Sequence, residues 1–264
     1  MITTLKWIFR LCWIGICALA MLQQTRLLLG MPLQPDWLDG YVLGSTIFAY
    51  GFTHPNRRIK SAAWLAGLFG GVCFLWPAVE ARHLVSWQML SVVPLLLWLL
   101  YYGMQRPGRA GLRGMPVAKP VVVGLTWATV TVWLPLPPES WADGSFVFIG
   151  RALFIGALAL AYDLSDLAYD RRRGFTTLAA RIGPEKTFRL IDLVLLAAAL
   201  CYIANTFLQI FSPAYTLALI ASLALSTWWL RYLMRATMRK DWQKILIDAL
   251  MPIQFLMAAA AEML

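Results

Sequence analysis

The chain has 264 residues, of which 60% are hydrophobic and 14% charged, and its formal net charge is +10 at pH 7. Soluble domains are usually about 45–50% apolar and about 25% charged, so this composition excludes an ordinary soluble protein. A transmembrane β-barrel is excluded because the sequence lacks the alternating segments of about ten residues that it needs. The composition therefore predicts an integral membrane protein built of helices, with residues 1–264 as one domain.

Apolar windows recur along the chain, and several approach the roughly 20 residues that a helix needs to cross the hydrocarbon core. We predict an all-α bundle of about nine transmembrane helices, at residues 7–28, 37–53, 61–79, 84–103, 117–136, 143–162, 188–210, 213–231 and 245–263. Prolines fall in or beside most of the proposed connections, where helices should stop. Pro77, Pro94 and Pro252 lie within or near the ends of spans and are expected to kink them.

The basic residues gather on one side of the predicted membrane. Most of the 23 Lys and Arg residues precede the first span or lie in alternate connections, which leaves only Arg26, Arg82 and Arg151 for the other side. The positive-inside rule then predicts a cytoplasmic N-terminus. The basic excess is explained by topology and by contact with anionic lipid, so we expect no nucleic-acid partner. A cleaved signal peptide is an alternative for the first span, and it would leave eight spans.

Three aspartates follow the sixth predicted span, at one boundary of the membrane. Asp163, Asp166 and Asp170 are spaced i, i+3 and i+7, which places them on one face of a helix over roughly 10 Å. Like charges this close repel unless a cation lies between them. Mg2+ suits such a site because it prefers oxygen ligands and commonly bridges one or two carboxylates to phosphate. Arg171 and Arg172 follow directly and could bind the same phosphate. The alternative is a solvated loop that mixes acids with bases.

A longer segment around these aspartates has a pattern of its own, Tyr162-Asp163-x-x-Asp166-x-x-x-Asp170-Arg171-x-x-Gly174-x-x-Thr177-Leu178-Ala179-x-x-Ile182-Gly183-x-x-Lys186. It resembles the second aspartate-rich motif of the UbiA superfamily of intramembrane prenyltransferases. In that family nine transmembrane helices surround a pocket, with aspartate motifs after helices 2 and 6. The predicted span count and the position of the cluster after the sixth span agree with this. The segment Leu112-Arg113-Gly114-Met115-Pro116 also resembles a divergent bacterial branch, which implies a bacterial inner membrane.

The resemblance implies a reaction. Mg2+ at Asp163, Asp166 and Asp170 would bind and ionise a prenyl diphosphate, Arg171 and Arg172 would contact the diphosphate, and the prenyl group would pass to a lipophilic acceptor from the bilayer. The charge argument is independent of the resemblance. Negative charge develops on the leaving diphosphate as the carbon–oxygen bond breaks, and a cation beside it stabilises that charge.

The end of the second span departs from the family pattern. The first motif, of the form NxxxDxxxD, belongs there, but the chain has Tyr50-Gly51-Phe52-Thr53-His54-Pro55-Asn56-Arg57-Arg58 and no aspartate. We expect Arg57 and Arg58 to neutralise phosphate charge, with His54, Asn56 and Tyr50 in the pocket. The plain alternative is a turn at His54-Pro55-Asn56 followed by arginines that only set the topology.

Asp248 lies inside the ninth predicted span, and acids at such a position usually face the bundle interior and pair. We expect it at the pocket, with a structural pair to a cytoplasmic arginine as the plainer role. The missing first motif leaves two functions open. One is a prenyltransferase, and the other is a catalytically degenerate relative that binds an isoprenoid or lipid or serves as a membrane scaffold. A solute transporter is disfavoured, since the sequence shows no internal repeat.

Overall fold

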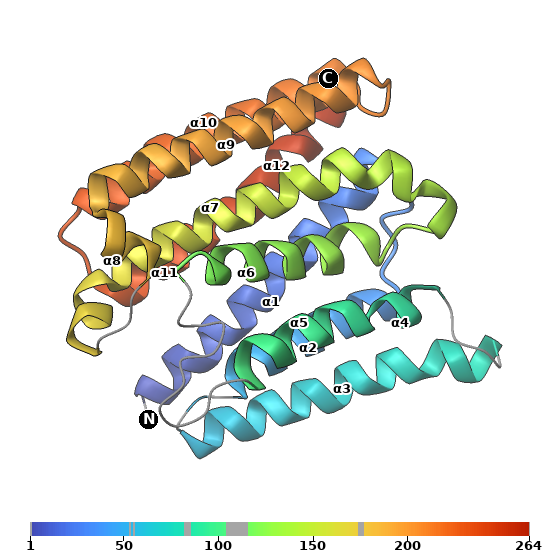
Figure 1. Ribbon diagram of the computed structural model, residues 1–264. Coiled ribbons are helices and arrows are strands. Elements are labelled where there is room, and N and C mark those ends of the chain that lie inside the picture. The colour runs from blue at the N-terminus through green and yellow to red at the C-terminus, as the bar shows by residue number, and fades with distance from the viewer. Residues whose placement is uncertain are drawn as a thin grey trace.

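The structure is a computed structural model that describes residues 2–52, 54, 56–81, 86–103, 116–173 and 177–263. The described chain forms a bundle of helices, as predicted (Figure 1). The α-helices are α1 (Ile2–Leu28), α2 (Trp37–Gly51), α3 (Arg57–Ala81), α4 (Ser86–Leu90), α5 (Val92–Gly103), α6 (Ala118–Ala128), α7 (Trp141–Arg173), α8 (Leu178–Ile182), α9 (Pro184–Phe207), α10 (Pro213–Arg235), α11 (Lys240–Asp248) and α12 (Leu250–Glu262).

Six segments of the described chain are long and apolar enough to cross a membrane, and they match six of the predicted spans. They are Leu5–Leu28, Arg57–Glu80, Pro138–Ala168, Pro184–Phe207, Pro213–Arg235 and Lys240–Glu262. The other predicted spans form shorter or interrupted helices. They correspond to α2, to the pair α4 and α5, and to α6 with the π-helical turn Thr129–Trp133 that continues it. The count of nine is therefore approximate.

Two of the three prolines that were expected to interrupt helices are each preceded, about one turn earlier, by a break in the helix. A proline cannot donate a hydrogen bond to the carbonyl four residues earlier, and its ring clashes with that carbonyl. Pro94 follows the break at Ser91 between α4 and α5, and Pro252 follows the break at Ala249 between α11 and α12. The second break leaves the carbonyl of Asp248 outside the helical ladder, where it lies 3.5 Å from Cys17 Sγ on α1. α3, by contrast, continues through Pro77.

Glycines allow two pairs of helices to approach closely. A Cβ atom on Gly44 of α2 would lie 2.7 Å from the backbone nitrogen of Gly70 on α3. A Cβ atom on Gly124 of α6 would lie 2.4 Å from the carbonyl oxygen of Ala152 on α7. Small residues at helix crossings are the usual means of close packing in membranes. The close approach at Gly124 lets α6 pack along α7. The first turn of α6 then lies against the half of α7 that bears the aspartates.

The longest helix, α7, runs through the middle of the bundle and packs against α6, α9 and α11. Its last turns, which bear the aspartates, lie at the same end of the bundle as the N-terminus, α8 and α11 (Figure 1). The chain reverses between α8 and α9 at Gly183, whose φ of 83° is readily available only to glycine.

Nearer the start of α7 lies Arg151, which is 1% exposed. Its guanidinium donates hydrogen bonds to the Met21 carbonyl at 2.8 Å, to Thr131 Oγ1 at 3.1 Å and to Gln24 Oε1 at 2.5 Å. These partners belong to α1 and to the π-helical turn. The arginine therefore ties three segments together through neutral acceptors.

Candidate active site

Two of the three predicted aspartates are paired with lysines from other helices. Asp163 is fully buried, and its Oδ1 atom forms an ion pair with Lys119 Nζ, from the first turn of α6. Asp166, one turn further along α7, lies 2.7 Å from Lys244 Nζ on α11. Side chains of the protein therefore supply a counter-charge to each of these two carboxylates.

Both lysines line a cavity of about 380 Å3 beside the aspartates. Most of its wall is apolar and comes from helices that are far apart in the sequence, with Ile14 of α1, Val123 of α6 and Leu158 of α7 as examples. The cavity is therefore an apolar chamber whose charged groups converge at one end. An amphiphile with an anionic head and a hydrocarbon tail matches that division.

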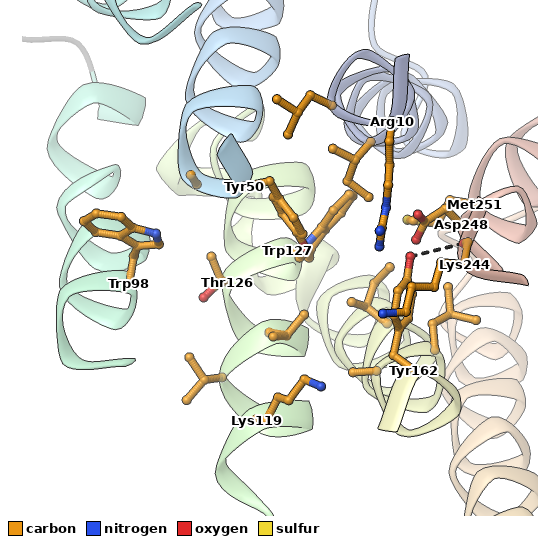
Figure 2. Close-up of a pocket in the computed structure, with 18 of the residues that line it drawn as sticks. Arg10, Tyr50, Trp98, Lys119, Thr126, Trp127, Tyr162, Lys244, Asp248 and Met251 are labelled. Atoms are coloured by element: carbon orange, nitrogen blue, oxygen red, sulfur yellow. Dashed lines mark hydrogen bonds between the residues drawn. The ribbon is translucent and has the colours of Figure 1, made fainter. Parts of the chain in front are cut away.

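A third cation and a further acid line the same cavity. Arg10 of α1, Tyr162 of α7 and Asp248 of α11 extend toward one another across it (Figure 2). The Tyr162 hydroxyl donates a hydrogen bond of 3.1 Å to the carbonyl of Lys244. Asp248 is 3% exposed and is the one acidic residue among the described residues that line the cavity.

Aromatic side chains form the opposite wall. Trp127 Nε1 donates a hydrogen bond of 3.2 Å to the hydroxyl of Tyr50, and Trp98 lies beyond them on α5 (Figure 2). Aromatic faces attract a cation by their quadrupole, by about 0.5–2 kcal/mol depending on desolvation. The wall is thus suited to an apolar ligand that carries positive charge.

The structure brings some of the predicted pocket residues to the cavity and places others outside it. Tyr50 and Asp248 line it as expected. His54 packs against Trp7, with ring centroids 4.5 Å apart, and the Asn56 side chain accepts a hydrogen bond from the Arg58 N–H at the start of α3. Burial, aided by Lys60, lowers the pKa of His54, which disfavours a cationic imidazole at neutral pH.

The first arginine pair also lies outside the cavity wall. Arg57 and Arg58 form the first turn of α3 and are exposed. Positive charge at a helix N-terminus opposes the helix dipole, so local stability does not explain their position. This placement fits the alternative of a capped turn followed by topology-setting arginines. The predicted contact of Arg57 and Arg58 with diphosphate stays a prediction.

The end of α7 is described only as backbone. Asp170, Arg171 and Arg172 belong to the helix, one to two turns beyond Asp166, and their side chains lie outside the described part of the chain. The segment Leu112–Pro116 falls largely outside it as well. The predicted roles of these residues therefore remain predictions.

Sequence reasoning treated the cavity's three cations as topology signals. Lys119, Lys244 and Arg10 belong to the basic residues that the positive-inside rule assigns to the cytoplasmic side, yet all three line the cavity. One signal was available: Lys244 and Asp248 are spaced i, i+4, which places both on one face of α11. No comparable spacing from an acidic residue identifies Lys119 or Arg10, because the acids near them in the fold, Asp163 and Asp248, are distant in sequence.

The donor atoms near the cavity suit a divalent metal that arrives with a phosphate ligand. Among the residues that the structure describes, no three His, Cys, Asp or Glu side chains form a group able to hold a metal ion. Mg2+, however, is commonly held by one or two carboxylates together with substrate phosphates and water. Asp163 and Asp166 supply such a pair on one helical face.

Residues 112–257, more than half of the chain, match the model of the UbiA prenyltransferase family. The chain belongs to this family. The matched region includes α6, the aspartate-bearing end of α7, and Lys244 and Asp248 of α11. The family resemblance inferred from the aspartate segment is confirmed.

A curated relative and a solved structure agree with the assignment. Digeranylgeranylglyceryl phosphate synthase of Methanothrix thermoacetophila is 29% identical over 149 residues, which are 55% of this chain and 52% of the relative. The chain thus spans about half the length of that relative. A solved structure of a digeranylgeranylglyceryl phosphate synthase superposes with a TM-score of 0.59 at 15% identity and covers 100% of both chains. This likeness confirms the UbiA-like helical fold.

Proposed function

We propose that this protein is an intramembrane prenyltransferase that uses Mg2+ to bind a prenyl diphosphate and transfers the prenyl group to a lipophilic acceptor. One observation supports this most directly. Asp163 and Asp166 each pair with a lysine that lines an apolar, partly aromatic cavity. The named relative, a digeranylgeranylglyceryl phosphate synthase, is also a synthase of an isoprenoid lipid by its name.

The charged end of the cavity would hold the diphosphate. Asp163 and Asp166, with Asp170 as a third predicted ligand, would hold Mg2+, which supplies Lewis-acid stabilisation of the leaving group when bound. Lys119 and Lys244 already extend to this end and would donate hydrogen bonds to diphosphate oxygens, since an ammonium group binds phosphate as a point charge. Arg171 and Arg172 are proposed to add charge from the end of α7.

The apolar part of the cavity would hold the prenyl chain. Trp127 and Tyr50 lie on the wall that faces the charged end, where the allylic carbon would gain positive charge (Figure 2). Their faces can stabilise this charge, while the surrounding apolar residues keep water from intercepting the carbon. The acceptor would enter from the bilayer.

A second function is favoured by one specific feature. The chain has no acidic residue at the end of α2, where the family's first aspartate motif belongs, so the set of metal ligands is reduced. A catalytically degenerate protein that binds an isoprenoid or lipid, or acts as a membrane scaffold, would retain the cavity and lose the need for metal.

Binding and turnover separate the two functions. Purified protein in detergent is expected to bind prenyl diphosphates of a series of chain lengths in the presence of Mg2+ but not in EDTA. Asp166→Asn should abolish this binding, whereas Asp143→Asn, an exposed acid in the first turn of α7, should not. With membrane extract as the source of acceptor, labelled prenyl groups should appear in lipid. Binding that persists unchanged in EDTA, without transfer, would favour the degenerate protein.

A further inference from the structure

Asp248 is a buried acid for which the proposed ionisation step has no use. It does not belong to the aspartate motif of α7, and it forms no ion pair with any basic residue that the structure describes. A carboxyl group at this depth in a membrane bundle is costly and usually has a function. Its position at the cavity wall suggests one.

The backbone around Asp248 holds the side chain in place. α11 ends at this residue because Pro252 cannot continue the helical ladder, and Ala249 forms the break. The freed carbonyl of Asp248 contacts Cys17 Sγ on α1, which anchors the end of α11 against α1. The carboxyl group then faces the cavity between Arg10 and Tyr162 (Figure 2).

Asp248 is also close to the end of the cavity where the diphosphate is proposed to lie. Lys244 precedes Asp248 by one helical turn and pairs with Asp166. The lysine at the diphosphate end of the cavity and Asp248 are therefore separated by only about 6 Å along α11. An allylic carbon next to a bound diphosphate would lie within this distance. An acceptor that approaches the carbon would pass near Asp248.

Prenyl transfer requires a proton acceptor as well as a metal. Among the described cavity residues, the ammonium groups of Lys119 and Lys244 and the guanidinium of Arg10 are donors without acceptor capacity. Asp163 and Asp166 are paired with lysines and do not line the cavity. Asp248 is the carboxylate that remains.

Resting on the proposed prenyl transfer, we propose that Asp248 is the general base that removes the proton from the acceptor. The carbon–oxygen bond of the prenyl diphosphate breaks, and its electron pair leaves with the diphosphate. An oxygen or aromatic carbon of the acceptor donates an electron pair to the allylic carbon. The hydrogen on that acceptor atom leaves as a proton to a carboxylate oxygen of Asp248, which becomes a neutral acid.

The groups that face Asp248 suit this cycle. Arg10 and Lys244 provide positive charge near the ionised carboxylate without forming a close ion pair with it, and the Tyr162 hydroxyl lies beside it. Arg10 and Lys244 also line the rest of the charged end, so an anionic acceptor head would be held next to the base.

Asp248→Asn tests the proposal, because it keeps the size of the side chain and removes its basicity. Transfer should fall by about 10²- to 10⁴-fold, the usual contribution of a general base. The affinity for a prenyl S-thiolodiphosphate, which ionises too slowly to react, and the slow release of diphosphate in the absence of acceptor should stay within about twofold of wild type. Asp248→Glu should recover part of the transfer, and formate should partly rescue Asp248→Ala.

The matched control is Asp241→Asn, which removes an exposed acid from the first turn of the same helix. It should transfer at the wild-type rate. Asp248→Asn that transfers normally, or that loses thiolodiphosphate affinity in parallel with transfer, would overturn the assignment of the base while leaving the prenyltransferase proposal intact. Wild-type protein that neither releases diphosphate nor transfers a prenyl group would overturn both.

Discussion

Two polar centres on one helix, α7, illustrate two ways of burying charge in a membrane bundle. Asp163 and Asp166 pair with lysines of α6 and α11 beside a cavity. Arg151, about 18 Å back along the helix at 1.5 Å per residue, is surrounded by neutral acceptors from α1 and the π-helical turn. It does not line the cavity. The first centre has opposite charges next to open volume, whereas the second has a single charge in a packed interior.

This difference assigns a functional role to the aspartate–lysine centre and a structural role to Arg151. A lysine beside a cavity can exchange its aspartate for a diphosphate oxygen when a metal takes the carboxylate, because both partners keep a counter-charge. Arg151 has no such exchange available, since its hydrogen bonds are made to the backbone and neutral side chains that it holds together. We therefore expect changes at the first centre to alter chemistry and changes at the second to alter stability.

Among changes at these two centres, the largest effect on activity is expected from Asp163→Asn. This change removes a proposed metal ligand and the aspartate partner of Lys119, so transfer should fall by at least about 10²–10³-fold, as is typical when one group that stabilises transition-state charge is lost. The assay is transfer of a labelled prenyl group. Asp143→Asn, at the opposite end of α7, is the matched control and should be neutral. Normal transfer by Asp163→Asn would show that the motif aspartates do not serve the reaction.

Arg151→Met should have the complementary effect. The buried acceptors Gln24 Oε1 and Thr131 Oγ1 would lose their donor, and each unsatisfied group costs about 1–3 kcal/mol. Thermal unfolding in detergent should therefore occur at a clearly lower temperature, while Mg2+-dependent diphosphate binding per folded molecule stays near wild type. Arg189→Met, at an exposed site on α9, is the control for loss of a positive charge. A stable variant that cannot bind diphosphate would contradict the division between the two centres.

Lys119→Met examines whether a lysine and a metal compete for Asp163. Without the lysine, the buried carboxylate no longer has the ammonium group as a competitor for a metal ion, so Mg2+ should bind more tightly. We expect about a tenfold lower Mg2+ concentration for half-maximal thermal stabilisation, measured without substrate. Lys186→Met, an exposed change on α9, should leave the Mg2+ dependence as in wild type. An unchanged Mg2+ dependence in Lys119→Met would mean that the lysine does not compete with metal.

The same contrast shows what sequence reasoning could reach. Local patterns predicted the helices, two of the three proline interruptions and the single helical face that bears Asp163 and Asp166, because these depend on spacing along one helix. The partners of these groups depend on how helices cross. Lys119 meets Asp163 because Gly124 lets α6 approach α7, and Arg151 meets Gln24 through the packing of α1, so neither contact has a local signature. The sequence alone does not distinguish a lysine that only sets the topology from one that lines the cavity, and the fold is needed to tell them apart.

The smallest effect is expected from the double change Arg57→Gln and Arg58→Gln. Both side chains are exposed in the first turn of α3 and outside the cavity wall, so the affinity for prenyl diphosphate should stay within about twofold of wild type. Binding by the folded, purified variant is the measurement, since a change in membrane insertion would then not affect the result. Lys244→Met is the matched comparison, because it removes one positive charge inside the cavity and should weaken binding far more. If the arginine pair instead weakens binding as strongly as Lys244→Met does, these arginines reach the diphosphate in the bound state. The substrate would then be held by charge from the start of α3 in place of the missing first motif.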